Sequence, residues 1–170
     1  MNSYGAKYNF IKILAFTLIF FLNQTLANKA EILNVAPNLM FVVVLCASLI
    51  ENSLSNIYYA LGFGLLFDFF NGKIMGVHVI LFLLLSYILS EIYHTYFENM
   101  ISVKTLLAVL GCFLYSLLFA VFFGLRGAGF ISVLIRISLI EFIYNALLSI
   151  AVIFIYTKII NIRKSAWRVR

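Results

Sequence analysis

About six long stretches of this chain consist almost entirely of apolar residues, and this feature limits the folds open to it. Apolar residues make up 65% of the 170 residues, and charged residues make up only 11%. A soluble domain of this length needs more polar surface than that. A transmembrane barrel would show alternating polar and apolar residues, whereas these runs are continuous. We therefore predict an all-α, polytopic membrane protein.

The chain has room for about six membrane helices of roughly 20 residues joined by short loops. We expect helices at residues 10–27, 36–50, 57–70, 74–92, 103–123 and 131–157, in a single membrane domain that covers residues 1–170. The first run follows Lys7 and ends in Thr25-Leu26-Ala27, a pattern that secretory signal peptides share. We expect this run to stay as a membrane helix, because it is longer than a typical signal segment and the remaining chain is polytopic.

The basic residues are distributed unevenly between the two sides that six spans define. Eight lie on the side of the termini: Lys7, Lys12, Lys104, Lys158, Arg163, Lys164, Arg168 and Arg170. Four lie on the opposite side: Lys29, Lys73, Arg126 and Arg136. The positive-inside rule then places both termini in the cytoplasm. The net charge of +6 reflects this topology and is no sign of nucleic-acid binding, although the basic tail could also bind anionic lipid head groups.

Asp68 is the only aspartate, and it lies near the turn between the third and fourth expected helices. A carboxylate at membrane depth costs about 2.5–3.5 kcal/mol on insertion scales, so it normally has a partner. Its own helix ends nearby with the negative pole of the helix dipole and cannot supply one. We expect Asp68 to accept N–H groups at the start of the fourth helix, or to be neutralised by Lys73, Arg126 or Arg136. The alternative is direct contact with a partner protein or a ligand.

A second polar feature lies on the last expected helix. At 100° per residue, four polar residues of this helix share one face: Ser138, Glu141, Asn145 and Ser149. Polar stripes in membranes usually hydrogen-bond to neighbouring helices, and we expect that role here. The alternative is that the stripe lines a cavity or a groove for a partner.

The sequence lacks the familiar enzyme signatures. It contains no Gly-x-Ser-x-Gly elbow, no His-Glu-x-x-His and no phosphate-binding glycine loop, and an intramembrane aspartyl protease would need two aspartates. Glu91, His94 and Glu98 share a helix face, but they make only half of a carboxylate-bridged metal site. Cys46 and Cys112 are isolated within apolar runs. We expect no enzymatic activity, no cofactor, no metal site and no disulfide.

The chain resembles the rod-shape-determining protein MreD family. The similarity runs through Pro37-Asn-Leu, then Gly64-Leu-Leu-Phe-Asp68, then Gly72, and Gly76 followed by His78, and it returns as Tyr144-Asn145-Ala-Leu-Leu in the last helix. It covers nearly the whole chain. The residue after the proline is usually acidic in this family, but it is Asn38 here. The resemblance therefore implies a role for a charged residue at Asp68 rather than at position 38.

The resemblance implies a non-enzymatic scaffold in the bacterial cytoplasmic (inner) membrane. Such a scaffold would belong to the elongation complex that maintains rod shape and positions peptidoglycan synthesis. The implied partners are an MreC-like protein above all, an MreB-like actin, a RodA-like glycosyltransferase and a class B penicillin-binding protein. The family is also similar in fold to the substrate-binding subunits of energy-coupling-factor transporters, which implies a six-helix bundle with an outward-facing cavity or groove. The candidate structural or partner-binding residues are Pro37, Gly64, Asp68, Gly72, Gly76, Glu141 and Asn145.

Two other functions stay open at this point. A small-molecule binding subunit of a vitamin or metal transporter would need several convergent polar groups on the outer side of the bundle. The sequence offers Asp68, His78, Arg126 and Arg136 for that purpose. An intramembrane enzyme is disfavoured, because neither a nucleophile nor an acid–base pair is recognisable.

Overall fold

The computed structural model describes residues 3–27, 35–51, 55–71, 75–97, 100–124 and 134–168. Every regular element in these ranges is a helix: α1 (Ser3–Ala27), α2 (Leu39–Ile50), α3 (Ser55–Asn71), α4 (Val77–Tyr96), α5 (Ile101–Phe123) and α7 (Leu139–Arg168), which a π-helical turn, η2 (Leu134–Ser138), precedes directly. The predicted all-α class with six main helices is therefore confirmed for this part of the chain.

The six helices differ in how much of a membrane they can cross. Three are long and apolar enough to span one, at Val77–Tyr96, Ile101–Phe122 and Leu139–Lys158. The apolar parts of the other three are shorter, at Phe10–Thr25, Leu39–Ile50 and Asn56–Phe70. At 1.5 Å per residue α2 is about 18 Å long, whereas the hydrocarbon core of a bilayer is about 30 Å thick. The ends of α2 therefore need polar partners within the protein.

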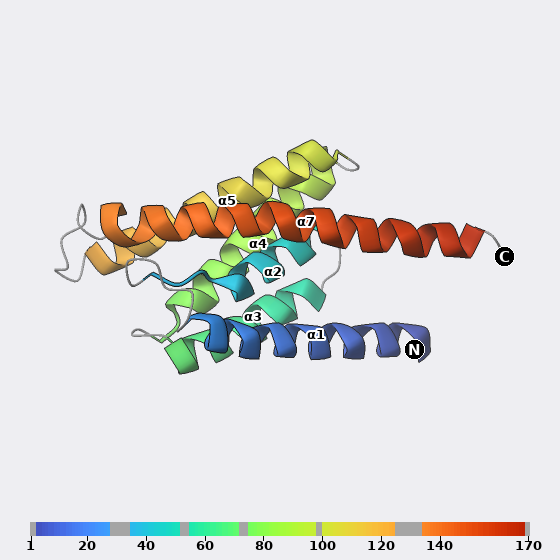
Figure 1. Cartoon of the computed structure of the whole chain (residues 1–170), viewed down its shortest axis with the longest axis horizontal. Coiled ribbons are helices and arrows are strands. Elements are labelled where there is room, and N and C mark those ends of the chain that lie inside the picture. The colour runs from blue at the N-terminus through green and yellow to red at the C-terminus, as the bar shows by residue number, and fades with distance from the viewer. Residues whose placement is uncertain are drawn as a thin grey trace.

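Helix α2 lies at the centre of the bundle. It packs against α1, α3, α4, α5 and α7, and Figure 1 shows it between α1 and α7. All ten residues from Met40 to Leu49 are buried. A helix that is apolar on every side belongs in a core. Around it, α3 packs most extensively on α4, and α5 packs on α7.

Two glycines allow neighbouring helices to approach closely. A Cβ atom at Gly64 on α3 would lie 2.9 Å from the Cα of Val79, so the backbones of α3 and α4 are in contact there. A Cβ atom at Gly111 on α5 would lie 2.7 Å from methyl groups of Leu45 and Leu89. Small residues at contacts between membrane helices serve this close approach.

The starts of α2 and α4 lie a few residues after the predicted ones. Helix α2 begins at Leu39 rather than at residue 36, because Asn38 is its N-cap and Pro37 precedes the cap instead of opening the first turn. Helix α4 begins at Val77, and its N-cap is Gly76. The φ angle of Gly76 is 95°, a left-handed conformation that glycine adopts without strain.

The outer helices also extend beyond the expected limits. Helix α1 begins at Ser3 and α7 continues to Arg168, and the residues that prolong the apolar runs include no proline to stop either helix. Helix α1 begins and α7 ends at the same end of the bundle (Figure 1). Gly72, one of the candidate structural or partner-binding residues, lies outside the described residues.

Replacing Gly64 by alanine should lower the stability of the fold, because the new methyl group would overlap the backbone of α4. Overpacking of this kind costs about 1–3 kcal/mol. Gly62→Ala is the matched control, since a Cβ atom there meets nothing within 4 Å. Thermal unfolding of both variants in one detergent should show a lower Tm for Gly64→Ala only. Equal losses in the two variants would contradict the packing.

Candidate functional site at the two ends of the central helix

Both ends of α2 are held by polar side chains from the helices around it. A helix leaves its first four N–H groups and its last four C=O groups without partners inside the helix. In the apolar core of a membrane each such group costs several kcal/mol if it stays unpaired. We call the polar residues at the start of α2 the N-end cluster: Asn23, Asn38, Asp68, His78, Tyr115 and Asn145. We call those at its end the C-end cluster: Lys12, Ser48, Glu51, Asn56, Ser90, His94 and Tyr156.

Backbone N–H groups at the start of α2 donate to amide side chains. The N–H of Asn38 donates to Oδ1 of Asn145 on α7 at 2.9 Å. The N–H of Leu39 donates to Oδ1 of Asn23 on α1 at 2.9 Å. Asn38 caps the helix itself, since its Oδ1 accepts from the N–H of Phe41 at 3.0 Å. The proline before Asn38 has no N–H and adds no unpaired donor.

A chain of hydrogen bonds connects Asn38 with α5 and α4. Nδ2 of Asn38 donates to the Tyr115 hydroxyl at 2.8 Å, and this hydroxyl lies 2.9 Å from Nδ1 of His78. Because the hydroxyl oxygen accepts from Asn38, its own proton is available to His78. All three residues are buried. A neutral amide suits this position, because it accepts from the helix and donates to the tyrosine, and a carboxylate cannot donate.

Asp68 joins the end of α3 to the start of α4. Its Oδ2 accepts from the N–H groups of Gly76 and Val79 at 2.9 and 3.1 Å, and its Oδ1 accepts from the N–H of His78 at 3.1 Å. These groups lie at the positive end of the α4 dipole, which stabilises the negative charge. The contact that the sequence predicted across the turn is therefore confirmed. Three backbone donors occupy this buried carboxylate, which leaves little of it for a ligand.

The polar stripe of α7 faces the interior of the bundle. Its four residues are all buried: Ser138, Glu141, Asn145 and Ser149. Asn145 bonds to α2, and the Sγ of Cys46 lies 3.7 Å from the backbone carbonyl of Ser149. The predicted contact between helices is thus present for Asn145. Within the described residues, Nδ2 of Asn145 and Oγ of Ser138 have no hydrogen-bond partner, and no hydrogen bond joins Glu141 to the N-end cluster.

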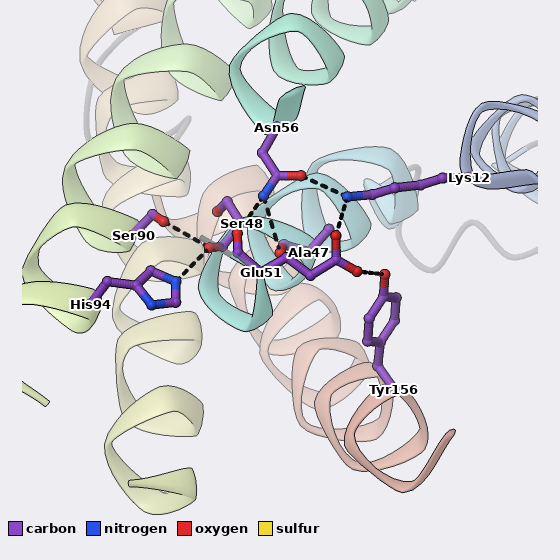
Figure 2. Close-up of polar contacts among 8 residues, drawn as sticks. All are labelled: Lys12, Ala47, Ser48, Glu51, Asn56, Ser90, His94 and Tyr156. Carbon is purple, nitrogen blue, oxygen red and sulfur yellow. Dashed lines mark hydrogen bonds and ion pairs between the residues drawn. The ribbon is translucent and has the colours of Figure 1, made fainter. Parts of the chain in front are cut away.

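The C-end cluster is built around an ion pair between a buried lysine and a partly buried glutamate (Figure 2). Nζ of Lys12 on α1 lies 2.7 Å from Oε2 of Glu51, the C-cap of α2, and donates to Oδ1 of Asn56 on α3 at 2.7 Å. The Tyr156 hydroxyl on α7 donates to the other carboxylate oxygen of Glu51 at 2.7 Å. The ammonium group also lies 4.9 Å from the centre of the Tyr59 ring, a cation–π contact. One ion pair thus connects four helices.

Carbonyl groups at the end of α2 also receive side-chain donors (Figure 2). Oγ of Ser90 donates to the Ser48 carbonyl at 2.7 Å, and Nε2 of His94 lies 3.3 Å from the same oxygen. Nδ2 of Asn56 donates to the Glu51 carbonyl at 2.6 Å. Asn56 therefore binds the end of α2 from the first turn of α3. Together with Lys12 and Tyr156, these contacts connect α2 to α1, α3, α4 and α7.

Sequence reasoning missed the C-end cluster. It used Lys12 only as a topology signal and treated Glu51 and Asn56 as loop residues. The available signal was the depth of Lys12, because a lysine within an apolar membrane run normally has a partner. Which carboxylate it meets depends on the packing of α1 against α2, and the sequence does not contain that information. Several candidates lie outside the described residues: Gly72, Lys73, Glu98, Arg126 and the side chain of Arg136.

Comparison with known proteins adds a finding to this geometry. A family model described as rod shape-determining protein MreD matches residues 4–161 of the chain. The matched range contains every residue of the two clusters. No curated protein and no solved structure matches the chain.

Lys12→Met should destabilise the protein, because the Glu51 carboxylate would stay in the cluster without its cation. Removing one partner of a fully buried ion pair costs about 3–5 kcal/mol. The loss here should lie at or below the lower end of this range, because the Glu51 side chain is partly exposed. The double variant Lys12→Met/Glu51→Gln should regain much of this loss, since neither charge remains. Thermal unfolding of the single and double variants in detergent measures both effects. A double variant less stable than Lys12→Met would show that the two residues do not act as a pair.

Asp68→Asn should lower the Tm, because the amide replaces an accepting oxygen with an NH₂ group that faces backbone N–H donors. The loss of such a charge-assisted contact in a buried site is worth about 1.5–3 kcal/mol. Glu91→Gln is the matched control, since Glu91 is an exposed carboxylate on α4. Similar Tm values for Asp68→Asn and Glu91→Gln would rule out a structural role for the Asp68 charge.

Proposed function

Because the chain belongs to the rod shape-determining protein MreD family, we propose that it is a membrane scaffold of the bacterial cell-wall elongation complex. Its family gives it a role in determining rod shape. The proposal adds that it performs this role without enzymatic activity. It does so by binding an MreC-like protein and thereby positioning peptidoglycan synthesis.

The observation that carries this proposal is the family match over nearly the whole chain. The structure supports it through the two clusters, which hold the surrounding helices to the ends of α2 by hydrogen bonds and an ion pair. A scaffold needs helices in fixed positions, because a partner helix is recognised by a surface of set shape. Asp68 and Asn145 serve the bundle in this way, and the partner meets surfaces that the clusters keep in place.

The proposal also names the partners of the chain and its orientation in the membrane. The MreC-like protein, which has one membrane helix, is the main partner, and the RodA-like glycosyltransferase, the class B penicillin-binding protein and the MreB-like actin belong to the same complex. Both termini lie in the cytoplasm and the bundle lies in the inner membrane. The excess of basic residues near the termini supports this orientation. The common end at which α1 begins and α7 ends also supports it (Figure 1).

The alternative function, a small-molecule binding subunit of a transporter, finds less support in the geometry. Asp68 already accepts three backbone N–H groups, and His78 contacts the Tyr115 hydroxyl. Both residues therefore serve the packing of α4. A ligand would have to displace these contacts.

Co-purification tests the proposal directly. The tagged chain, co-expressed with the MreC-like protein of the same genome and placed in nanodiscs, should elute from size exclusion as a stoichiometric complex. Native mass spectrometry of the same sample identifies any bound small molecule. A folded chain that stays alone and carries such a molecule would replace the scaffold function with the transporter one.

A further inference from the structure

Gly62 on α3 is a glycine that the packing of the chain does not explain. A Cβ atom built there meets nothing within 4 Å, whereas Gly64 and Gly111 each sit at a close contact between helices. Its backbone is not in the left-handed region, which among the described glycines only Gly76 adopts. Glycine inside a helix costs about 1 kcal/mol relative to alanine. No contact within the chain compensates for the cost of having glycine at position 62.

Gly62 lies at the centre of the outward face of α3. At 100° per residue, the side chains around it on this face are those of Tyr58, Leu65, Leu66 and Phe69. All four are exposed, with exposed fractions between 41% for Leu66 and 74% for Tyr58. Large apolar side chains thus surround a position without one. We call this surface, made of Tyr58, Gly62, Leu65, Leu66 and Phe69, the α3 face.

Helix α3 is also short for a helix with an exposed apolar face. Its apolar part, Asn56–Phe70, is about 22 Å long at 1.5 Å per residue, against about 30 Å for the hydrocarbon core. The still shorter α2 avoids this mismatch with lipid because it is buried. A short exposed helix is accommodated when the bilayer thins or when another helix covers it. This second observation is independent of the glycine.

We propose that the α3 face docks a single membrane-spanning helix of a partner, whose backbone approaches α3 at Gly62. A helix fits this surface better than lipid does. Flexible lipid chains fill a surface of any shape, but two helix backbones come close only across a small residue. Gly64, two residues away on the opposite side of α3, already shows such an approach towards α4. The inference rests on the proposed function, because it takes the partner helix to be that of the MreC-like protein.

Placing a large side chain at Gly62 should prevent formation of the complex and leave the chain folded. Gly62→Leu adds a side chain where the protein has no atom within 4 Å of the Cβ position. Ala15→Leu on α1 and Ala151→Leu on α7 are the matched controls, because both alanines are small, exposed residues on other helices. In the co-expression assay with the MreC-like protein in nanodiscs, we expect at least about a tenfold weaker complex for Gly62→Leu, about 1.4 kcal/mol. The controls should bind as the wild type does, and none of the three variants should have a Tm below that of the wild type.

Cysteine cross-linking gives a readout that does not depend on the Gly62→Leu variant. A cysteine at Leu65 should cross-link to cysteines placed along the partner helix, and a cysteine at Ala151 should not. A Gly62→Leu chain that binds as the wild type does, or cross-links at Ala151 but not at Leu65, would overturn the docking surface and leave the proposed function standing. A wild-type chain that forms no complex would overturn both.

Discussion

A buried helix that is too short to cross a membrane needs partners for the backbone groups at both of its ends, and the rest of this structure depends on how α2 obtains them. Its start receives Asn23 from α1 and Asn145 from α7, and its cap contacts Tyr115 of α5. Its end receives side chains from α1, α3, α4 and α7. Because unpaired backbone groups are costly in an apolar medium, these contacts decide where each surrounding helix can lie.

The same logic explains the partners of two carboxylates, Glu51 and Asp68. Glu51 is accompanied by the Lys12 ammonium and the Tyr156 hydroxyl, and Asp68 by three backbone N–H groups. One carboxylate is thus compensated by a cation and the other by the start of a helix. Since these polar groups are engaged inside the protein, recognition of a membrane partner falls to the apolar outer faces. Among the glycines whose surroundings are described, Gly62 of the α3 face combines a short exposed helix with the absence of any contact.

The amide at position 38 shows how the cluster depends on exact hydrogen-bonding roles. Its oxygen caps α2, and its Nδ2 group donates to Tyr115, which in turn contacts His78. A carboxylate at this position would keep the cap but lose the donor. The Tyr115 hydroxyl would then donate its proton to position 38. Its contact with His78 would persist only if Nδ1 of His78 carried a proton and donated to the hydroxyl oxygen. Position 38 therefore adds no charge to an end of the bundle that already holds the Asp68 carboxylate.

The sequence by itself determined the helical class. It also favoured an inward direction for the α7 stripe and offered the contact of Asp68 across its turn as one of several possibilities. These features follow from local properties: continuous apolar runs, the 100° rotation per residue and the cost of an unpaired carboxylate. Only the tertiary structure decided that Lys12 meets Glu51, because that pairing depends on how distant segments pack. It also decided that Gly64 lies against the backbone of α4, whereas the Cβ position of Gly62 has no neighbour within 4 Å. Both are glycines of one helix, and only the neighbours that packing brings to each side distinguish them.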